Sequence, residues 1–256
     1  MIKKTAILTA LLLAAAARSF AGRVIERELA CPVCGQVFYA RLETSRPQVE
    51  MRLDLKPVGY GPALLPSCPK CGFVTYRLPM PRAELAKCKT IVASEGYKKN
   101  IRRSTYFRLG LLYENLGAPA FTLANTYLKA SWQEEKEAAD LKDDQERSLK
   151  YFAACSLSCR DEEKENSQLL TVELLRRLGR FGEAGAALEK LRGLKGFQNN
   201  FFADILAYQA GLCRENDSSP HDMEEVRVSR MPFFSRVKWK TRKFLNSFRR
   251  PAADAS

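Results

Sequence analysis

The spacing of apolar residues along the chain changes near residue 81. Before it, three short apolar runs that begin at Val37, Val49 and Phe73 are predicted as strands, and in the second run apolar and polar side chains alternate. After it, apolar residues recur with a period of about 3.6, which is typical of amphipathic helices. The pattern predicts an α+β fold that is mostly α, with a β module at residues 22–80 and a helical domain at residues 81–216.

The helical domain contains the pattern of a tetratricopeptide repeat. Residues 106–113 have the order aromatic-x-x-Leu-Gly-x-x-Tyr of its first helix, and Gly117 and Pro119 form the turn to a second helix. A closer match turns at Gly179, within residues 174–191. We therefore expect a tetratricopeptide-like array of helical hairpins.

Further helices are predicted around this array. One begins at Pro81, one covers residues 148–159, and one at residues 201–213 caps the stack, because each repeat buries its face only against a neighbour. Cys155 and Cys159 lie four residues apart on one helical face and could bind metal, but with no histidine nearby we expect them to pack in the core. The expected apolar face of this helix consists of Leu149, Phe152, Ala153 and Leu157.

The strongest chemical signal is the motif C-P-x-C-G, which occurs at residues 31–35 and again at residues 68–72. Two cysteines with this spacing can face one point from a tight turn, and the glycine permits a positive φ that turns backbone N–H groups toward the sulfurs. Two such turns can supply four thiolates to one tetrahedral Zn²⁺. We predict a structural zinc site in a zinc-ribbon-like module. Its ligands are Cys31, Cys34, Cys68 and Cys71.

Two other uses of these four cysteines stay open. They could form two disulfides, since the chain has eight cysteines, an even number, and an exported protein meets oxidising conditions. Either pair could instead be a redox-active CxxC, although that motif belongs at a strand-to-helix junction and the predicted surroundings are short strands. We favour zinc, and we expect Cys88 to be a core residue of its helix.

The paired CPxCG motifs, the helices after them and the segment ELLRRLGRF at residues 173–181 resemble the uncharacterised bacterial family called domain of unknown function 2225. The resemblance covers about residues 29–195. It implies an architecture of metal-binding knuckles followed by repeat-like helices. The family has no assigned activity, so the resemblance implies no reaction.

Residues 1–21 have the composition of a secretory signal peptide. Lys3 and Lys4 precede an apolar run at residues 5–17, and Ser19 and Ala21 occupy the small-residue positions of a cleavage site. The run is shorter than the roughly 20 residues that span a bilayer. We expect an exported protein of the bacterial envelope, periplasmic or extracellular.

Residues 217–256 are predicted to be a polar linker followed by a basic amphipathic tail. The linker contains the only histidine, His221, which we expect to be exposed to solvent. Residues 227–250 hold nine basic residues and no acidic one, which favours binding to an anionic membrane surface; the alternative is a solvated, partly disordered tail, and export disfavours nucleic acid. The expected contacts are Arg236, Lys238, Lys240, Arg242, Lys243, Arg249 and Arg250.

The chain lacks the sequence signals of common enzyme classes. It has no GxxxxGK[ST] loop and no GxGxxG motif after a strand, and no catalytic triad can be assembled around one histidine. We therefore expect a non-enzymatic, zinc-binding scaffold whose helices bind a protein or peptide, with no small-molecule substrate. The alternatives are a thiol–disulfide oxidoreductase that uses a CxxC pair, and polyanion binding led by the tail.

Overall fold

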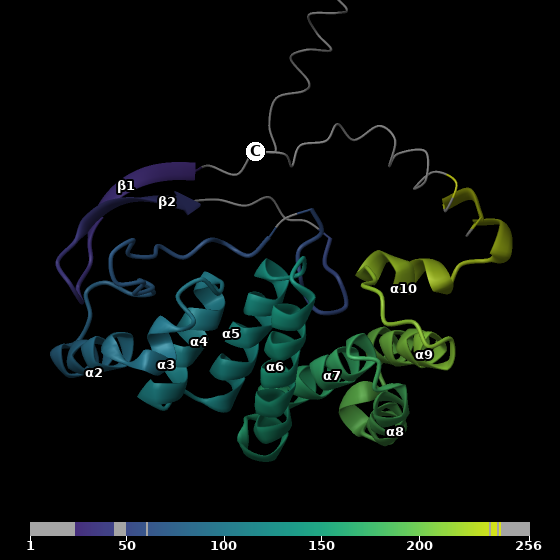
Figure 1. Cartoon of the computed structure of the whole chain (residues 1–256). Coiled ribbons are helices and arrows are strands. Elements are labelled where there is room, and N and C mark those ends of the chain that lie inside the picture. The colour runs from purple at the N-terminus through teal and green to yellow at the C-terminus, as the bar shows by residue number, and fades with distance from the viewer. Residues whose placement is uncertain (1–23, 44–49, 60, 236, 240, 242–256) are drawn as a thin grey trace, which may run out of the picture.

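The computed structural model describes residues 24–43, 50–59, 61–235, 237–239 and 241 of the 256-residue chain. It is mostly helical, with one small antiparallel sheet near the N-terminus, so the predicted α+β class is confirmed. In Figure 1 the hairpin lies above a row of helices that runs from α2 to α9. The predicted signal peptide, at residues 1–21, lies outside the described residues.

The sheet is a hairpin of β1 (Val24–Ala30) and β2 (Val37–Glu43), in a register that pairs Val24 with Glu43 and Ala30 with Val37. The strand expected at Val37 is therefore confirmed. We did not predict β1, because its three consecutive charged residues, Glu26, Arg27 and Glu28, conceal the alternation of a strand.

The other two predicted strands are wrong. In the described part of both stretches, the structure forms only isolated bridges: Met51 with Pro57, Arg52 with Asp222, and Ser67 with Val74. Leu55 adopts a φ of 64°, which reverses the chain after a few residues. Val74 is fully buried against helices, so its apolar character reflects the helical core.

From α4 to α9, each helix packs against the next one along the chain. Pro81 caps the first helix, as predicted. This order is compatible with a scaffold built from stacked helices; the tetratricopeptide-like geometry stays a prediction. The helices are α2 (Arg82–Ala93), α3 (Glu95–Lys98), α4 (Thr105–Leu116), α5 (Ala120–Gln133), α6 (Ala138–Ser158), α7 (Asp161–Arg177), α8 (Phe181–Arg192), α9 (Asn200–Arg214) and α10 (Met223–Ser229).

The glycine turns of the helical domain lie where the sequence predicts them. Gly117 ends α4 with a φ of 75°, and Gly179 follows α7 with a φ of 73°. Such left-handed positions are adopted by glycine at little cost. They allow consecutive helices to fold back against each other.

Helix α6 is longer than predicted, and part of its expected apolar face is wrong. Leu149, Phe152 and Cys155 are buried, whereas Leu157 is 91% exposed. Leu157 lies five residues after Phe152, and at about 100° per residue this rotation carries it to the opposite side of the helix. Ala153 is also exposed.

The predicted polar linker is part of the folded body. The backbone N–H of Leu53 donates to the carbonyl of His221 at 2.9 Å, and the N–H of Met223 donates to the carbonyl of Met51 at 2.8 Å. Buried Arg176 donates to the carbonyls of the neighbouring loop at Asp217 and Ser219. The chain after α9 is therefore joined to a segment that precedes the second cysteine motif. Among the described residues, no helix combines the length and apolar composition needed to cross a bilayer.

Candidate metal centre

The two C-P-x-C-G segments, which we call the knuckles, adopt the same backbone conformation. The N–H of Gly35 donates to the carbonyl of Cys31, and the N–H of Gly72 donates to the carbonyl of Cys68, both at 2.9 Å. The glycines have φ values of 74° and 73°. The sequence prediction of paired, glycine-dependent turns is confirmed.

The knuckles bring all four predicted ligands together, and we call these four residues the cysteine centre. Their sulfur atoms all lie within 4.8 Å of one another. Cys31 Sγ is 3.7 Å from Cys71 Sγ, and Cys34 Sγ is 3.5 Å from Cys68 Sγ. Zn–S bonds of about 2.3 Å in a tetrahedron separate the sulfurs by about 3.8 Å, whereas a disulfide bond is about 2.05 Å long. The centre can therefore hold a metal ion, and its four cysteines are free thiols.

The surroundings affect the thiols differently. Burial raises the pKa of Cys31 and of Cys71. A hydrogen bond from the backbone N–H of Gln36 lowers the pKa of Cys34 to about 7. A bound cation would favour the thiolate form throughout, since a coordinating thiol is deprotonated. The donor set thus fits a thiophilic ion such as Zn²⁺.

Two side chains from the helical body hold the second knuckle. Arg108 of α4 donates from Nη1 to the carbonyl of Gly72 at 2.7 Å and to Oγ of Ser67 at 2.9 Å. The hydroxyl of Tyr97 donates to the same Gly72 carbonyl at 3.0 Å. Arg108 is buried, and burial lowers its pKa. Among the described residues, its guanidinium donates to backbone carbonyls and to a serine hydroxyl, not to a carboxylate. Four thiolates around a divalent ion carry net negative charge, which this cation would offset.

The cysteine centre shares a hydrophobic core with the first helices. Cys31 and Cys68 are buried in the same cluster as Cys88 of α2 and Leu112 of α4. The predicted core position of Cys88 is confirmed, because its side chain is fully buried. A metal ion at the knuckles would therefore hold the β module and the helices in one folded unit.

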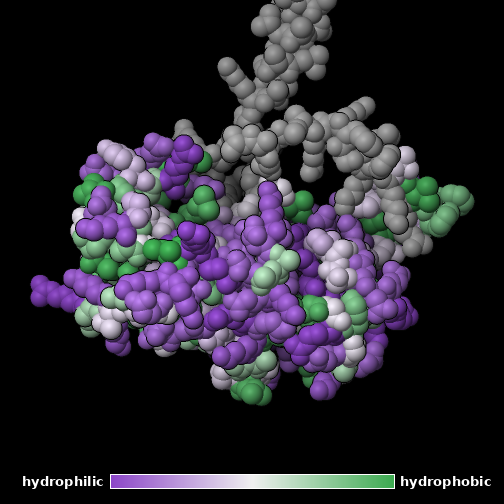
Figure 2. Space-filling model, viewed as in Figure 1, coloured by the Kyte–Doolittle hydropathy of each residue, from purple (hydrophilic) through white to green (hydrophobic). Residues whose placement is uncertain are grey.

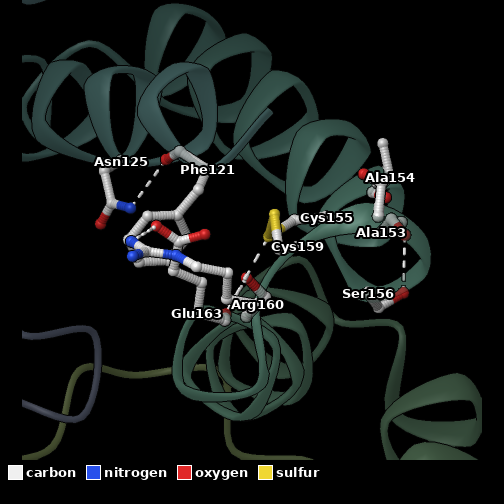
Figure 3. The surroundings of a disulfide bond; sticks show 11 residues. Phe121, Asn125, Ala153, Ala154, Cys155, Ser156, Cys159, Arg160 and Glu163 are labelled. Carbon is white, nitrogen blue, oxygen red and sulfur yellow. Dashed lines mark hydrogen bonds and ion pairs between the residues drawn. A yellow bond between two sulfur atoms is a disulfide. The ribbon is translucent and has the colours of Figure 1, made fainter. Parts of the chain in front are cut away.

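Cys155 is buried, as expected for a core residue, but the pair also forms a disulfide (Figure 3), which the sequence prediction does not include. Cys155 lies on α6, and Cys159 is the residue at which the helix ends. Their Cα atoms lie 4.9 Å apart. That separation lies in the range of disulfides. The bond lies next to the start of α7, where Arg160 pairs with Glu163 (Figure 3).

The expectation of an exposed His221 is also wrong. Its ring contacts Glu225 Oε2 at 2.7 Å through Nδ1 and Asp217 Oδ2 at 3.0 Å through Nε2, and its side chain is 14% exposed. The hydroxyl of Tyr208 on α9 lies 3.2 Å from Nδ1. The hydrogen bond with Glu225 is the main cause that raises the pKa of His221. The spacing of Asp217, His221 and Glu225, four residues each, is the signal in the sequence that could have indicated this cluster.

Of the predicted tail contacts, Lys238 lies among the described residues and is exposed. The others, Arg236, Lys240, Arg242, Lys243, Arg249 and Arg250, lie outside them. No family model, curated protein or solved structure gives a significant match to this chain. The resemblance to domain of unknown function 2225 therefore stays a prediction that rests on the motifs quoted above.

Proposed function

We propose that the cysteine centre binds one structural Zn²⁺ and that the protein is a non-enzymatic scaffold for a protein or peptide partner. The observation that carries the proposal is the convergence of four free thiols from two matching knuckles on one point. Four protein ligands complete a tetrahedral zinc shell, which leaves no position for a substrate. The proposal therefore assigns the metal to folding and recognition to the helices.

The proposed zinc acts through the core that it shares with the helices. Cys31 and Cys68 contact the same cluster as α2 and α4, and Arg108 and Tyr97 both donate to the carbonyl of Gly72, the residue after Cys71. Because metal binding to such a site contributes directly to the free energy of folding, metal loss is expected to loosen the β module and the adjoining helices together.

The scaffold role rests on the stack of helices and on the lack of sequence signals for an enzyme. The stack extends from α4 to α9, and surfaces of this kind bind partners over an extended face. His221 is already engaged by two carboxylates and a tyrosine, which favours a structural role for it. With the predicted signal peptide, we place this scaffold in the bacterial envelope.

The test measures metal and thiols on one sample of natively exported protein. Elemental analysis is expected to find about one zinc per chain, lost in Cys31→Ser and in Cys68→Ser. The matched control is Cys213→Ser, because Cys213 is a buried free thiol far from the knuckles in the sequence and in a different hydrophobic cluster. Alkylation after chelation and unfolding, without reductant, is expected to modify six cysteines, namely those that are free.

A different outcome would support the alternative function. No metal, together with oxidised cysteines at the knuckles, would refute the zinc site and favour a thiol–disulfide oxidoreductase. That activity would then have to appear as reduction or oxidation of a model dithiol that is lost in Cys34→Ser and retained in Cys213→Ser.

A further inference from the structure

The chain after α10 leaves the hydrophobic core within a few residues. Val226 and Val228 of α10 are buried, and Arg227 contacts Glu50 at 2.8 Å. From Met231 onward, large apolar side chains are exposed. We call four of them the apolar patch: Met231 (41% exposed), Phe233 (64%), Phe234 (84%) and Val237 (47%).

Two contacts fix the patch in place from either side. Arg230 contacts Asp204 of α9 at 3.1 Å, and Nε1 of Trp239 donates to Glu224 of α10 at 3.0 Å. The rings of Phe233 and Phe234 contact each other edge to face, with centroids 5.7 Å apart. The segment that carries the patch therefore contacts the helical domain on both sides, through Arg230 before it and Trp239 after it. Figure 2 shows hydrophobic residues at the corner where the chain continues beyond α10 in Figure 1.

The sequence around the patch has one sign of charge. Residues 227–250 contain nine lysines and arginines and no aspartate or glutamate. Phe233, Phe234 and Val237 lie within a 100° arc at helical spacing, and apolar residues recur at similar spacing at Phe244 and Phe248. A segment with exposed aromatic residues among basic ones has the composition of helices that lie in a membrane interface.

We propose that the apolar patch and the basic residues of the same segment bind the surface of an anionic lipid bilayer. The aromatic rings enter the boundary between headgroups and acyl chains, and the lysines and arginines that follow Arg230 in the sequence contact lipid phosphates. Asp204 near this segment is paired with Arg230, and Glu224 accepts a hydrogen bond from the neutral indole of Trp239. The nine basic residues at positions 227–250 outnumber these two carboxylates, so the segment keeps a net positive charge. Met231 and Val237 favour a bilayer over a nucleic acid, because exposed aliphatic side chains gain little beside a phosphate backbone.

The test is vesicle sedimentation of the whole mature chain at low and high salt. Wild-type protein is expected to bind vesicles of phosphatidylcholine mixed with phosphatidylglycerol, and to bind vesicles of phosphatidylcholine alone at least tenfold more weakly, since each basic residue near an anionic surface raises affinity about fivefold. The double variant Phe233→Ala/Phe234→Ala is expected to lose about tenfold or more in affinity. The matched control is Leu157→Ala, which removes an exposed leucine from α6.

Quenching by brominated acyl chains adds a second readout. Trp132 is buried in the helical core, so quenching on vesicle binding is expected to disappear in Trp239→Phe. Equal binding to neutral and anionic vesicles, or unchanged binding by the double phenylalanine variant, would overturn the proposal. Binding to duplex DNA that the double variant retains, without binding to vesicles, would assign the segment to nucleic acid instead. Zinc content of the same samples keeps this result separate from the test of the cysteine centre.

Discussion

Gly110 of α4 packs directly against the ring of Tyr127 of α5, and its replacement by alanine is the sharpest test of the helical packing. A Cβ at this position would lie 2.5, 2.7 and 3.0 Å from three atoms of the Tyr127 ring. The ring is fully buried between Phe107, at a centroid distance of 5.8 Å, and Tyr151, at 6.0 Å. Normal carbon–carbon contacts are about 3.5–4.0 Å, so the two helices must separate by about 1 Å.

Two opposing effects determine how much Gly110→Ala changes the free energy of unfolding. Alanine is more favourable than glycine in a helix interior by about 0.8–1 kcal/mol. Overpacking of a buried site costs about 1–3 kcal/mol, and the cost falls at the upper end here because the ring cannot move aside. We therefore expect Gly110→Ala to lower the free energy of unfolding by about 1–2 kcal/mol.

Gly185→Ala is the matched control, because a Cβ at Gly185 of α8 meets no atom within 4 Å. This variant should gain about 0.5–1 kcal/mol from helix propensity. In thermal unfolding followed by circular dichroism, Gly110→Ala should lower the Tm by several degrees and Gly185→Ala should raise it slightly. In a Tyr127→Leu background, Gly110→Ala should cost less. A Gly110→Ala protein as stable as wild type would refute the close approach of α4 and α5.

Three further predictions concern the part of the chain between the end of α6 and the start of α10. Because Glu225 raises the pKa of His221, the stability that the imidazolium contributes is fully present below its unfolded pKa of about 6.5 and is lost as pH rises through the higher folded pKa. The difference in unfolding free energy between wild type and His221→Gln should therefore shrink as the pH rises above about 6.5. A difference that grows with pH would contradict a raised pKa of His221 in the folded protein. Arg176→Met should lower the free energy of unfolding in urea by about 3–5 kcal/mol, because it leaves buried Glu173 without its cationic partner. Arg180→Met, which removes an exposed ion pair with Glu183, should lower it by at most about 1 kcal/mol. Cys159→Ser should lower the free energy of unfolding by about 2 kcal/mol, because the disulfide restricts the unfolded chain, and reductant should lower the stability of wild type to the same value. If reductant also destabilised the variant, its effect would have to come from other cysteines.

Tertiary contacts account for several of the failed sequence predictions. Phe73 and Val74 are apolar, as the residues of a strand would be, but in the structure their side chains fill the core beside α2 and α4. His221 is polar and stands among polar residues, and only the fold brings Tyr208 of α9 to its ring. Cys155 and Cys159 have helical spacing, and their disulfide forms at the end of α6, where Cys159 is the residue that caps the helix; hydrophobic periodicity does not report such an end effect.

Local chemistry determined the parts of this protein that depend on a few adjacent residues. The C-P-x-C-G spacing and the glycines at 35, 72, 117 and 179 specify turns by their own conformational preferences, so the knuckles and the turns after α4 and α7 follow from the sequence alone. The meeting of the two knuckles, the insertion of Arg108 beneath Gly72 and the attachment of His221 to residues 51–53 join segments 30 or more residues apart. Such contacts depend on how whole helices pack, and only the tertiary structure decided them.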